Sequence, residues 1–414
     1  IYGDKPNEKK LFFKHTYLSN LVKLLVHVKI SKGKPKQFDE IVPILFGNTF
    51  EQAGIKNFIE EDFFAWILSA PIRKQSSKIF YDLLQEIYVY DLDKIGEDVL
   101  KELYQELVDP DVRKLLGEFY TPDWLAEHMI EQVLQKNAEL SVMDPSCGSG
   151  TFLFKTIQYK IDALLNKGWE KPKILEHIIE NVIGFDVHPL AVIIAKTNYL
   201  LALKELLHQR KSSISIPVYL SDSLKVPTKT IDVSTALTAF EFEALDKKFT
   251  FPLSIVQDIS KMDYIIDKMR NHGSEYVNII NKVKNSSLSI NLTETRNNLL
   301  NSFERTLLAQ NDEEKSILMY SIKTLFDLIE KESDSIWTYV LRNMYRPVSI
   351  SYKKVDVLMG NPPWLALQFM KNLQYQDYLK SRSKNYGLTD PKKVQNITHL
   401  ELATLFFCQT TDAY

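Results

Sequence analysis

The residues with the clearest chemical potential form the short turn Asn361-Pro362-Pro363-Trp364. Because proline has no backbone N–H, the two prolines add hydrogen-bond acceptors to this turn and no donors. The side-chain carbonyl of Asn361 and the backbone carbonyl of Pro362 could hold both hydrogens of an amino group and stabilise positive charge as its nitrogen attacks an electrophile. Trp364 offers a face on which a planar ring can stack. The turn suits an exocyclic amino group on a flat base, although X-Pro-Pro-aromatic also occurs as an ordinary turn.

A glycine-rich loop, residues 144–150, is the second candidate site. It reads Asp144-Pro145-Ser146-Cys147-Gly148-Ser149-Gly150 and follows a buried strand predicted at 140–143. Gly148 and Gly150 let the backbone come close to a ligand between a strand end and a helix start. Leu153 stands where the dinucleotide fingerprint has its third glycine, which favours a smaller adenosine ligand over NAD. Cys147 has no evident base partner, so we expect it to pack.

Two further carboxylates end predicted strands. Asp186 closes the apolar strand 181–185 and suits a ribose diol. Asp222 follows the strand 216–220, where a turn or helix-capping aspartate is the alternative. His188 has no Cys or His cluster around it, so the sequence predicts no metal site.

The elements that must position these residues predict an α/β fold with a doubly wound, mainly parallel sheet. Four strands can be found, the last at 355–359 and reached through Arg346-Pro347. In the order 3-2-1-4, the strand ending at Asp144 neighbours the strand ending at Gly360. Because ligands bind where the winding reverses, the loop and the turn are expected side by side despite their separation in sequence.

The pattern of elements divides the chain into four parts. Helical periodicity predicts an N-terminal helical domain over 1–112, including helices near 63–68 and 98–108, and a structural platform is its expected role. Residues 113–229 form the cofactor-binding part, 230–345 a helical insertion, and 346–414 the catalytic part. Lysines, arginine and tyrosines in 371–393 form either a nucleic-acid surface or a solvated loop.

Composition sets broad limits. The 414 residues are 45% hydrophobic and 25% charged, as in globular proteins, and a net charge of −2 gives no bulk attraction to nucleic acid. Two cysteines exclude a disulfide framework and fit a reducing cytoplasm. No run reaches a membrane-spanning length, and Ile1 opens no signal peptide. The lack of an initiator methionine suggests that residue 1 lies inside a longer gene product.

Taken together, these motifs resemble the N6-adenine DNA methyltransferases whose cofactor motifs precede the catalytic one, the gamma-type order. The matching segments are Phe119-Tyr-Thr-Pro, Asp144-Pro-Ser-Cys-Gly-Ser-Gly, Phe185-Asp186, Ser221-Asp222 and Asn361-Pro-Pro-Trp. They cover roughly residues 113–225 and 346–410. The helical front domain and the insertion are similar to those of type I and fused type II restriction-modification enzymes.

The resemblance implies a Rossmann-like fold, S-adenosyl-L-methionine as methyl donor and no metal. The implied cofactor-binding residues are Tyr120 and Thr121 near the methionine carboxylate, Asp144 at its ammonium, Pro145, Gly148 and Gly150 against the cofactor, Asp186 at the ribose, Val187 and His188 beside the adenine, and Asp222 at the adenine amino group. The implied catalytic residues are Asn361, Pro362, Pro363 and Trp364, which would hold and stack a flipped-out adenine.

The resemblance also implies partners and leaves alternatives. Double-stranded DNA, a recognition domain or subunit and a nuclease of the same prokaryotic system are the implied partners. The alternatives are a protein-glutamine or RNA methyltransferase, or a DNA-binding subunit without catalysis. The family's sheet has seven strands, so four predicted strands lead us to expect a fragment that lacks the later strands.

Overall fold

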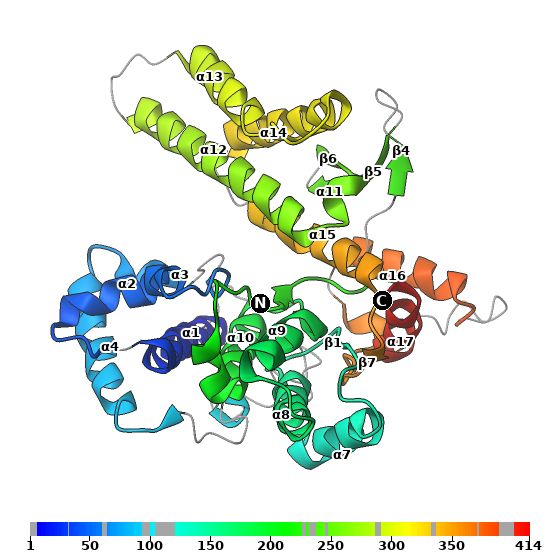
Figure 1. Cartoon of the computed structure of the whole chain (residues 1–414). Helices are drawn as coiled ribbons and strands as arrows, with labels where there is room; N and C mark the ends of the chain where they lie inside the picture. Colours follow the sequence, from blue (N-terminus) through cyan, green and yellow to red (C-terminus); the bar gives the residue numbers. More distant parts are fainter. Residues whose placement is uncertain are drawn as a thin grey trace. The chain divides into compact units, whose positions relative to one another are not determined.

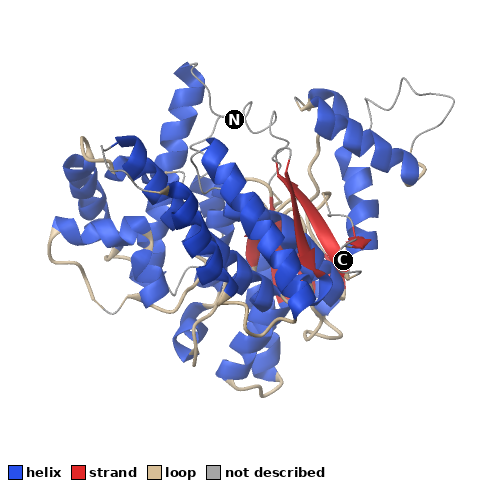
Figure 2. Cartoon of the chain, turned by 90° about the horizontal axis from the view of Figure 1, so that it is seen from above, coloured by secondary structure: helices blue, strands red, loops and turns tan. Residues whose placement is uncertain are grey.

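The computed structural model divides the chain into two compact units (Figure 1). Unit 1 comprises Ile1–Ser223 and Val355–Asp412, and unit 2 comprises Leu224–Lys354 and Ala413–Tyr414. The residues that the structure describes are 6–31, 33–59, 64–92, 100–103, 121–225, 229–231, 237–244, 247–285, 291–332, 337–370, 372–388 and 401–414. Most of these described residues are helical (Figure 2). The four predicted functional parts stay a prediction.

A four-stranded parallel sheet organises unit 1. Its strands are β1 (Val142–Asp144), β2 (Val182–Asp186), β3 (Val218–Leu220) and β7 (Val357–Leu358). Their order is β3-β2-β1-β7, with Val142 opposite both Val182 and Val357. This confirms the predicted order 3-2-1-4 and the α/β fold class.

Helical crossovers give the sheet its winding. Helices α8 (Thr151–Asn166) and α9 (Lys171–Asn181) connect β1 to β2, and α10 (Pro189–Ala202) leads from β2 toward β3, followed by the 3-10 helix η4 (Lys204–Gln209). Both crossovers step away from β7, so the winding reverses between β1 and β7. Helix α7 (Asp123–Leu134) shares a small core with α8, β1 and Met359.

The described N-terminal residues are mainly helical, as predicted. Their elements are α1 (Pro6–Ile30), η1 (Phe38–Glu40), α2 (Ile41–Phe46), α3 (Asn48–Gln52), η2 (Ala65–Leu68) and α4 (Arg73–Ile87). The helix predicted near 63–68 is only the 3-10 helix η2 among the described residues. Of the helix predicted at 98–108, residues 98–99 and 104–108 lie outside the described part.

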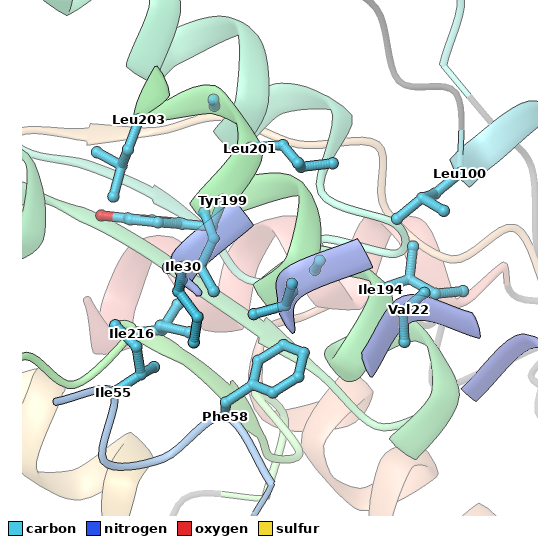
Figure 3. Close-up of a cluster of buried hydrophobic side chains, with 14 of the residues drawn as sticks. Val22, Ile30, Ile55, Phe58, Leu100, Ile194, Tyr199, Leu201, Leu203 and Ile216 are labelled. Atoms are coloured by element: carbon cyan, nitrogen blue, oxygen red, sulfur yellow. The ribbon is translucent and has the colours of Figure 1, made fainter. Parts of the chain in front are cut away.

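Helix α1 and the sheet helix α10 share one hydrophobic core. Figure 3 shows Val22 and Ile30 of α1 in one cluster with Ile194 and Tyr199 of α10. Leu18, Val22 and Leu24 are at most 1% exposed. The N-terminal helices are therefore a layer packed with α10 onto the parallel sheet.

Hydrogen bonds of Asn57 fasten the N-terminal segment to the residues before β3. Its Nδ2 donates to the Ile216 carbonyl at 2.8 Å, and its Oδ1 accepts from the Ile216 N–H at 2.6 Å. The buried Lys196 ammonium of α10 donates to the Asn57 carbonyl at 2.5 Å. Because all these groups are buried, each bond satisfies a polar atom that water cannot reach.

Unit 2 contains helices and an antiparallel sheet. Its helices are α11 (Leu253–Val256), α12 (Ile259–Asn285), α13 (Leu292–Glu304), α14 (Asp312–Glu332) and α15 (Trp337–Lys353). Its strands β4 (Lys229–Ile231), β5 (Thr238–Ala244) and β6 (Lys247–Pro252) form a sheet separate from that of unit 1. The prediction of a helical insertion therefore missed a sheet. The alternation of β5, Thr-Ala-Phe-Glu-Phe-Glu-Ala, is a period-two pattern that indicates it.

The prediction that the sheet resumes at Arg346-Pro347 is wrong, because both residues lie inside α15. Proline normally disfavours a helix interior. Here α15 is held by its buried face, which includes Tyr345 and Val348, and by Arg346, which pairs with Asp263 of α12 at 3.7 Å. Tertiary packing thus outweighs the local signal.

In the described stretches 359–370, 372–388 and 401–414, three elements follow β7. They are η5 (Leu367–Phe369), α16 (Leu373–Asn385) and α17 (Leu402–Ala413). The apolar helix predicted at 399–409 corresponds to α17, and its first two predicted residues lie outside the described part. Gln376 donates to the Leu367 carbonyl at 2.6 Å, which ties α16 back to the segment after Trp364.

Candidate active site at the carboxyl ends of the strands

The loop after β1 and the turn after β7 touch directly. A Cβ added to Gly360 would lie 2.3 Å from Oδ1 of Asp144, so only glycine fits beside this carboxylate. The Ser146 hydroxyl donates to the backbone carbonyl of Asn361 at 3.2 Å. Two segments more than 200 residues apart in sequence therefore meet where the winding reverses.

Asp144 is a buried acid whose surroundings disfavour its charged form. It is 2% exposed, and Oδ1 accepts from the Ser146 N–H at 3.0 Å. Burial raises the pKa of Asp144 to about 8; the Ser146 bond opposes this rise and the nearby Asp186 carboxylate adds to it. A cation at Asp144 would favour its charged form.

The glycines of the loop do different things. Gly148 has φ +53° and no atom within 4 Å of an added Cβ, so it borders open space. Gly150 has φ +89°, and an added Cβ would lie 3.1 Å from Ala195 of α10. Asn198 of α10 donates to the Ser149 carbonyl at 2.9 Å. The loop is thus packed against α10 and open at Gly148.

Cys147 is buried beneath this loop. Burial raises the pKa of its thiol, with further increases from Asp186 and Asp144. An added Cβ at Gly184 would lie 3.2 Å from the Cys147 sulfur, so the thiol packs closely on β2. A protonated, buried thiol fits the packing role expected for Cys147.

The Asp186 carboxylate binds backbone N–H groups of the glycine loop after β1 and of its own loop after β2. Oδ2 accepts from the Gly148 N–H at 2.9 Å and Oδ1 from the His188 N–H at 2.8 Å. Burial raises the pKa of Asp186, and hydrogen bonds from His188, Gly148 and Val187 oppose the rise. These three bonds use three of the roughly four acceptor positions of the carboxylate, so one remains for a ligand. Val187 is 67% exposed beside it and offers apolar surface.

His188 begins helix α10 and contacts a residue of α1 that is far from it in sequence. Its side chain is buried, and Nδ1 accepts from the Ala191 N–H at 3.4 Å as the N-cap of α10. Its ring meets that of His15 of α1 edge-on, with centroids 5.7 Å apart. Burial lowers the pKa of His188 to about 4, so the ring is neutral at neutral pH. Its predicted place beside the cofactor adenine stays a prediction.

Asp222 lies in a turn that is fastened to both neighbouring motifs. The Ser221 N–H donates to the Asp186 carbonyl at 2.8 Å, and the Ser223 hydroxyl donates to the Pro145 carbonyl at 2.5 Å. The hydroxyl of Tyr375, from α16, forms a side-chain hydrogen bond with the Asp222 carboxylate. No local pattern links residues 222 and 375, so the sequence alone does not predict this tyrosine at the site.

An ion-pair cluster holds the segment that begins at Thr121. Tyr120 lies outside the described residues, and Thr121 is 8% exposed. Lys101 pairs with Asp123, and Lys155 of α8 lies 3.2 Å from the same carboxylate. Burial alone would raise the pKa of Asp123, but bonds from Lys101 and Lys155 lower it below its ordinary value. This cluster joins α7 to the helix that follows the glycine loop, and the sequence analysis did not single it out.

The catalytic candidates lie together in the turn after β7. The Trp364 indole N–H donates to Oδ1 of Asn361 at 2.8 Å, and the indole is 48% exposed. Pro362 and Pro363 are half-buried. The side-chain acceptor of Asn361 is thus already directed toward the exposed Trp364 ring.

The predicted basic and aromatic surface at 371–393 has partners where it is described. Tyr375 stacks on Tyr378 with ring centroids 6.1 Å apart, and Tyr386 donates to Asp412 at 2.9 Å. Arg382 donates to Gln409 of α17 at 3.2 Å. Lys371 and residues 389–393 lie outside the described part. These contacts assign much of α16 to packing.

Within the described ranges, no group of three or more His, Cys, Asp or Glu side chains could hold a metal ion. In the same part of the chain, no helix is both long and apolar enough to cross a membrane.

Part of the chain matches a known family of proteins. The model of the N-6 DNA methylase family matches residues 96–250, which include the loop and the carboxylates Asp144, Asp186 and Asp222. The resemblance to the N6-adenine DNA methyltransferases is confirmed. The methylase match ends before the turn at Asn361.

Two curated relatives share this methylase region. Type II methyltransferase M.VspI of Vibrio sp. (strain 343) is 26% identical over 137 residues, 33% of this chain and 29% of the relative. Adenine-specific methyltransferase PglX of Streptomyces coelicolor is 24% identical over 138 residues, 31% of this chain and 11% of the relative. The chain thus matches less than a third of the length of either.

Two solved structures are distantly similar to the chain. The DrdV–DNA complex, solved by cryo-electron microscopy, is 19% identical with a TM-score of 0.31, covering 54% of this chain and 26% of that one. A nuclease-deletion mutant of the Type ISP restriction-modification enzyme LlaGI, in complex with a DNA substrate mimic, is 14% identical with a TM-score of 0.32, covering 51% and 17%.

Proposed function

We propose that this chain transfers a methyl group from S-adenosylmethionine to N6 of an adenine flipped out of duplex DNA, within a restriction-modification system. The observation that carries the proposal is the contact of Gly360 with the Asp144 carboxylate, supported by the Ser146–Asn361 hydrogen bond. It brings an acidic glycine loop within reach of an amino-group acceptor, which is the arrangement that methyl transfer between two bound substrates requires.

The chemistry of the strand ends fits S-adenosylmethionine. The molecule presents an ammonium, two ribose hydroxyls and an adenine amino group, and all of these are hydrogen-bond donors. Asp144, Asp186 and Asp222 place acceptors after three adjacent parallel strands, and the loop is open at Gly148. We assign the three carboxylates to these donors in that order. Thr121, Val187 and His188 remain proposed contacts, as does Tyr120.

S-adenosylmethionine, when bound, supplies an electrophilic methyl group on sulfur. In our proposal the Asn361 side chain and the Pro362 carbonyl accept from the adenine amino group, hold it in line and stabilise the charge that develops on nitrogen. The half-exposed Trp364 ring stacks on the base. Pro363 keeps the turn rigid, because its ring fixes φ.

DNA and the other members of such a system are proposed partners. The match to the N-6 DNA methylase family and the named methyltransferase relatives support DNA as the substrate class. A recognition domain or subunit and a nuclease follow from the restriction-modification proposal alone.

The acceptor class can be tested with tritiated S-adenosylmethionine. The chain is incubated with duplex DNA, RNA and a protein mixture, and DNA is digested to nucleosides after the reaction. We expect tritium in the DNA digest, in the fraction that elutes as N6-methyldeoxyadenosine. Counts in RNA or in glutamine of protein, without counts in DNA, would overturn the proposal in favour of those acceptors.

The cofactor assignment is tested by calorimetry with S-adenosylhomocysteine. Asp186→Ala removes the acceptor proposed for the ribose, so we expect affinity to fall by about 10-fold or more. Equal affinity of variant and wild type would contradict the assignment. If neither binds while DNA is bound, the chain is a DNA-binding subunit without catalysis.

A further inference from the structure

Tyr375 of α16 stands at the end of β3 although it lies 153 positions after Asp222 in the sequence. Its hydroxyl hydrogen-bonds the Asp222 carboxylate, and Tyr378 is the neighbouring ring on which it stacks. Burial and the Asp222 charge raise the pKa of Tyr375, so its hydroxyl keeps its proton and donates. The contact is therefore a donor aimed at a carboxylate.

Both partners of this bond are held in place from other sides. The Tyr375 N–H donates to Asn372, the N-cap of α16, at 3.0 Å, and Tyr378 hydrogen-bonds Gln409 of α17. Figure 1 shows α16 and α17 as neighbours, consistent with the Arg382–Gln409 bond between them. On the other side, Ser221 and Ser223 fasten the turn that carries Asp222. The Asp222 side chain therefore has a fixed backbone and a fixed hydrogen-bond donor, so its carboxylate has little freedom to rotate.

We propose that Tyr375 is a positioning residue that makes Asp222 selective for an amino group on the cofactor's purine ring. This rests on the proposed function, in which Asp222 accepts from the adenine amino group. A donor on one carboxylate oxygen favours the charged form of Asp222, which can only accept hydrogen bonds. Such a group binds an amino group and repels a carbonyl at the same ring position.

The selectivity is measured as a ratio of two dissociation constants. S-adenosylhomocysteine carries the amino group, and S-inosylhomocysteine carries a carbonyl in its place. For the wild-type chain we expect the adenosine compound to bind at least about 10-fold more tightly, since a carbonyl cannot donate to the carboxylate and is repelled by its charge. In Tyr375→Phe the carboxylate can turn or take up a proton, so the ratio should fall by about 3- to 10-fold.

A matched control is Tyr386→Phe, at the other end of α16. It also removes a hydroxyl that donates to an aspartate at 2.9 Å, but that aspartate, Asp412, belongs to helix α17 and does not follow a strand. Its selectivity ratio should equal that of the wild type. If Tyr375→Phe weakens both compounds equally and leaves the ratio unchanged, Tyr375 only packs and the inference is overturned.

Asp222→Asn separates failure of the inference from failure of the proposed function. If Asp222→Asn keeps the wild-type ratio, Asp222 does not contact the purine amino group and the proposed function loses that assignment. If the selectivity ratio falls in Asp222→Asn but stays at the wild-type value in Tyr375→Phe, Asp222 contacts the purine amino group and only the proposed role of Tyr375 is overturned. Tyr375→His restores a ring N–H donor and should recover part of the ratio, and it provides a second variant should Tyr375→Phe not fold.

Discussion

At the scale of single residues, the contact between Gly360 and Asp144 explains why a distant turn and a glycine loop form one site. An added methyl group at Gly360 would overlap the carboxylate, because its nearest oxygen lies 2.3 Å away and belongs to a fully packed side chain. The need for glycine at position 360 therefore comes from this close approach, because Gly360 does not have a positive φ.

Gly360→Ala should therefore destabilise unit 1 by about 1 to 3 kcal/mol through overpacking. It should also reduce methyl transfer, because Asp144 and the Asn361 turn must separate. Gly33→Ala is the control, since an added Cβ there meets nothing within 4 Å, and its effect should stay within about 0.5 kcal/mol. Denaturant unfolding of both variants measures the difference. Equal stability of the two variants would show that Asp144 moves aside freely.

The pKa of Asp144 predicts a proton released on cofactor binding. Its folded value is about 8, against an ordinary value of 3.8, so Asp144 holds a proton at about pH 6.5 in the free chain. An ammonium brought to this carboxylate favours the charged form and expels that proton. Calorimetry with S-adenosylhomocysteine in two buffers of different ionisation enthalpy should show release of about one proton. Asp144→Asn should release none, and an unchanged proton count in that variant would contradict the assignment.

The same raised pKa sets the sign of a stability effect. Between about pH 4 and pH 8 the folded chain holds a proton on Asp144 that the unfolded chain has released. The contribution of Asp144 to stability is therefore greatest at low pH and falls as pH rises through this window.

At the scale of elements, the N-terminal helices support the sheet instead of standing apart from it. Asn57 satisfies both backbone groups of Ile216, and Lys196 of α10 binds the Asn57 carbonyl. Residues 214–216 lead directly into β3, which ends beside Asp222. This layer thus helps to place one of the three carboxylates.

Asn57→Ala should cost about 2 to 4 kcal/mol, because it leaves the buried Ile216 N–H without its partner and removes one of two hydrogen bonds to the Ile216 carbonyl, which the Val218 N–H also contacts. It should also weaken binding of S-adenosylhomocysteine through displacement of β3. Asn291→Ala removes the N-cap of α13 in unit 2 and should cost only about 1 kcal/mol with no change in affinity. Thermal unfolding and calorimetry compare the two variants. Full cofactor affinity in a destabilised Asn57→Ala would show that the layer contributes stability alone.

The elements also show what sequence can and cannot predict. The order of the sheet followed from short apolar strands that each end in a polar motif, since parallel strands with one switch point leave few arrangements. The strand β5 was missed although its alternation is visible, and α15 passes through Pro347 because its packing outweighs a local penalty. Contacts such as His15 with His188 and Tyr375 with Asp222 join residues far apart, and no local pattern contains them.

At the scale of the whole molecule, the candidate site lies within unit 1 and is built from two separate stretches of sequence. Unit 2 occupies the sequence between them and has its own hydrophobic core. The central claim is that the turn at Asn361 accepts the target amino group beside a cofactor held by the strand-end carboxylates.

The most direct test of this claim measures methyl transfer to duplex DNA and cofactor affinity in the same Asn361→Ala preparation. Loss of the side-chain acceptor should lower transfer by about 100- to 1000-fold, the effect of removing one group that stabilises developing charge. The dissociation constant for S-adenosylhomocysteine should stay within about twofold of wild type, because the carboxylates are untouched. Undiminished transfer, or loss of cofactor binding together with transfer, would contradict the account.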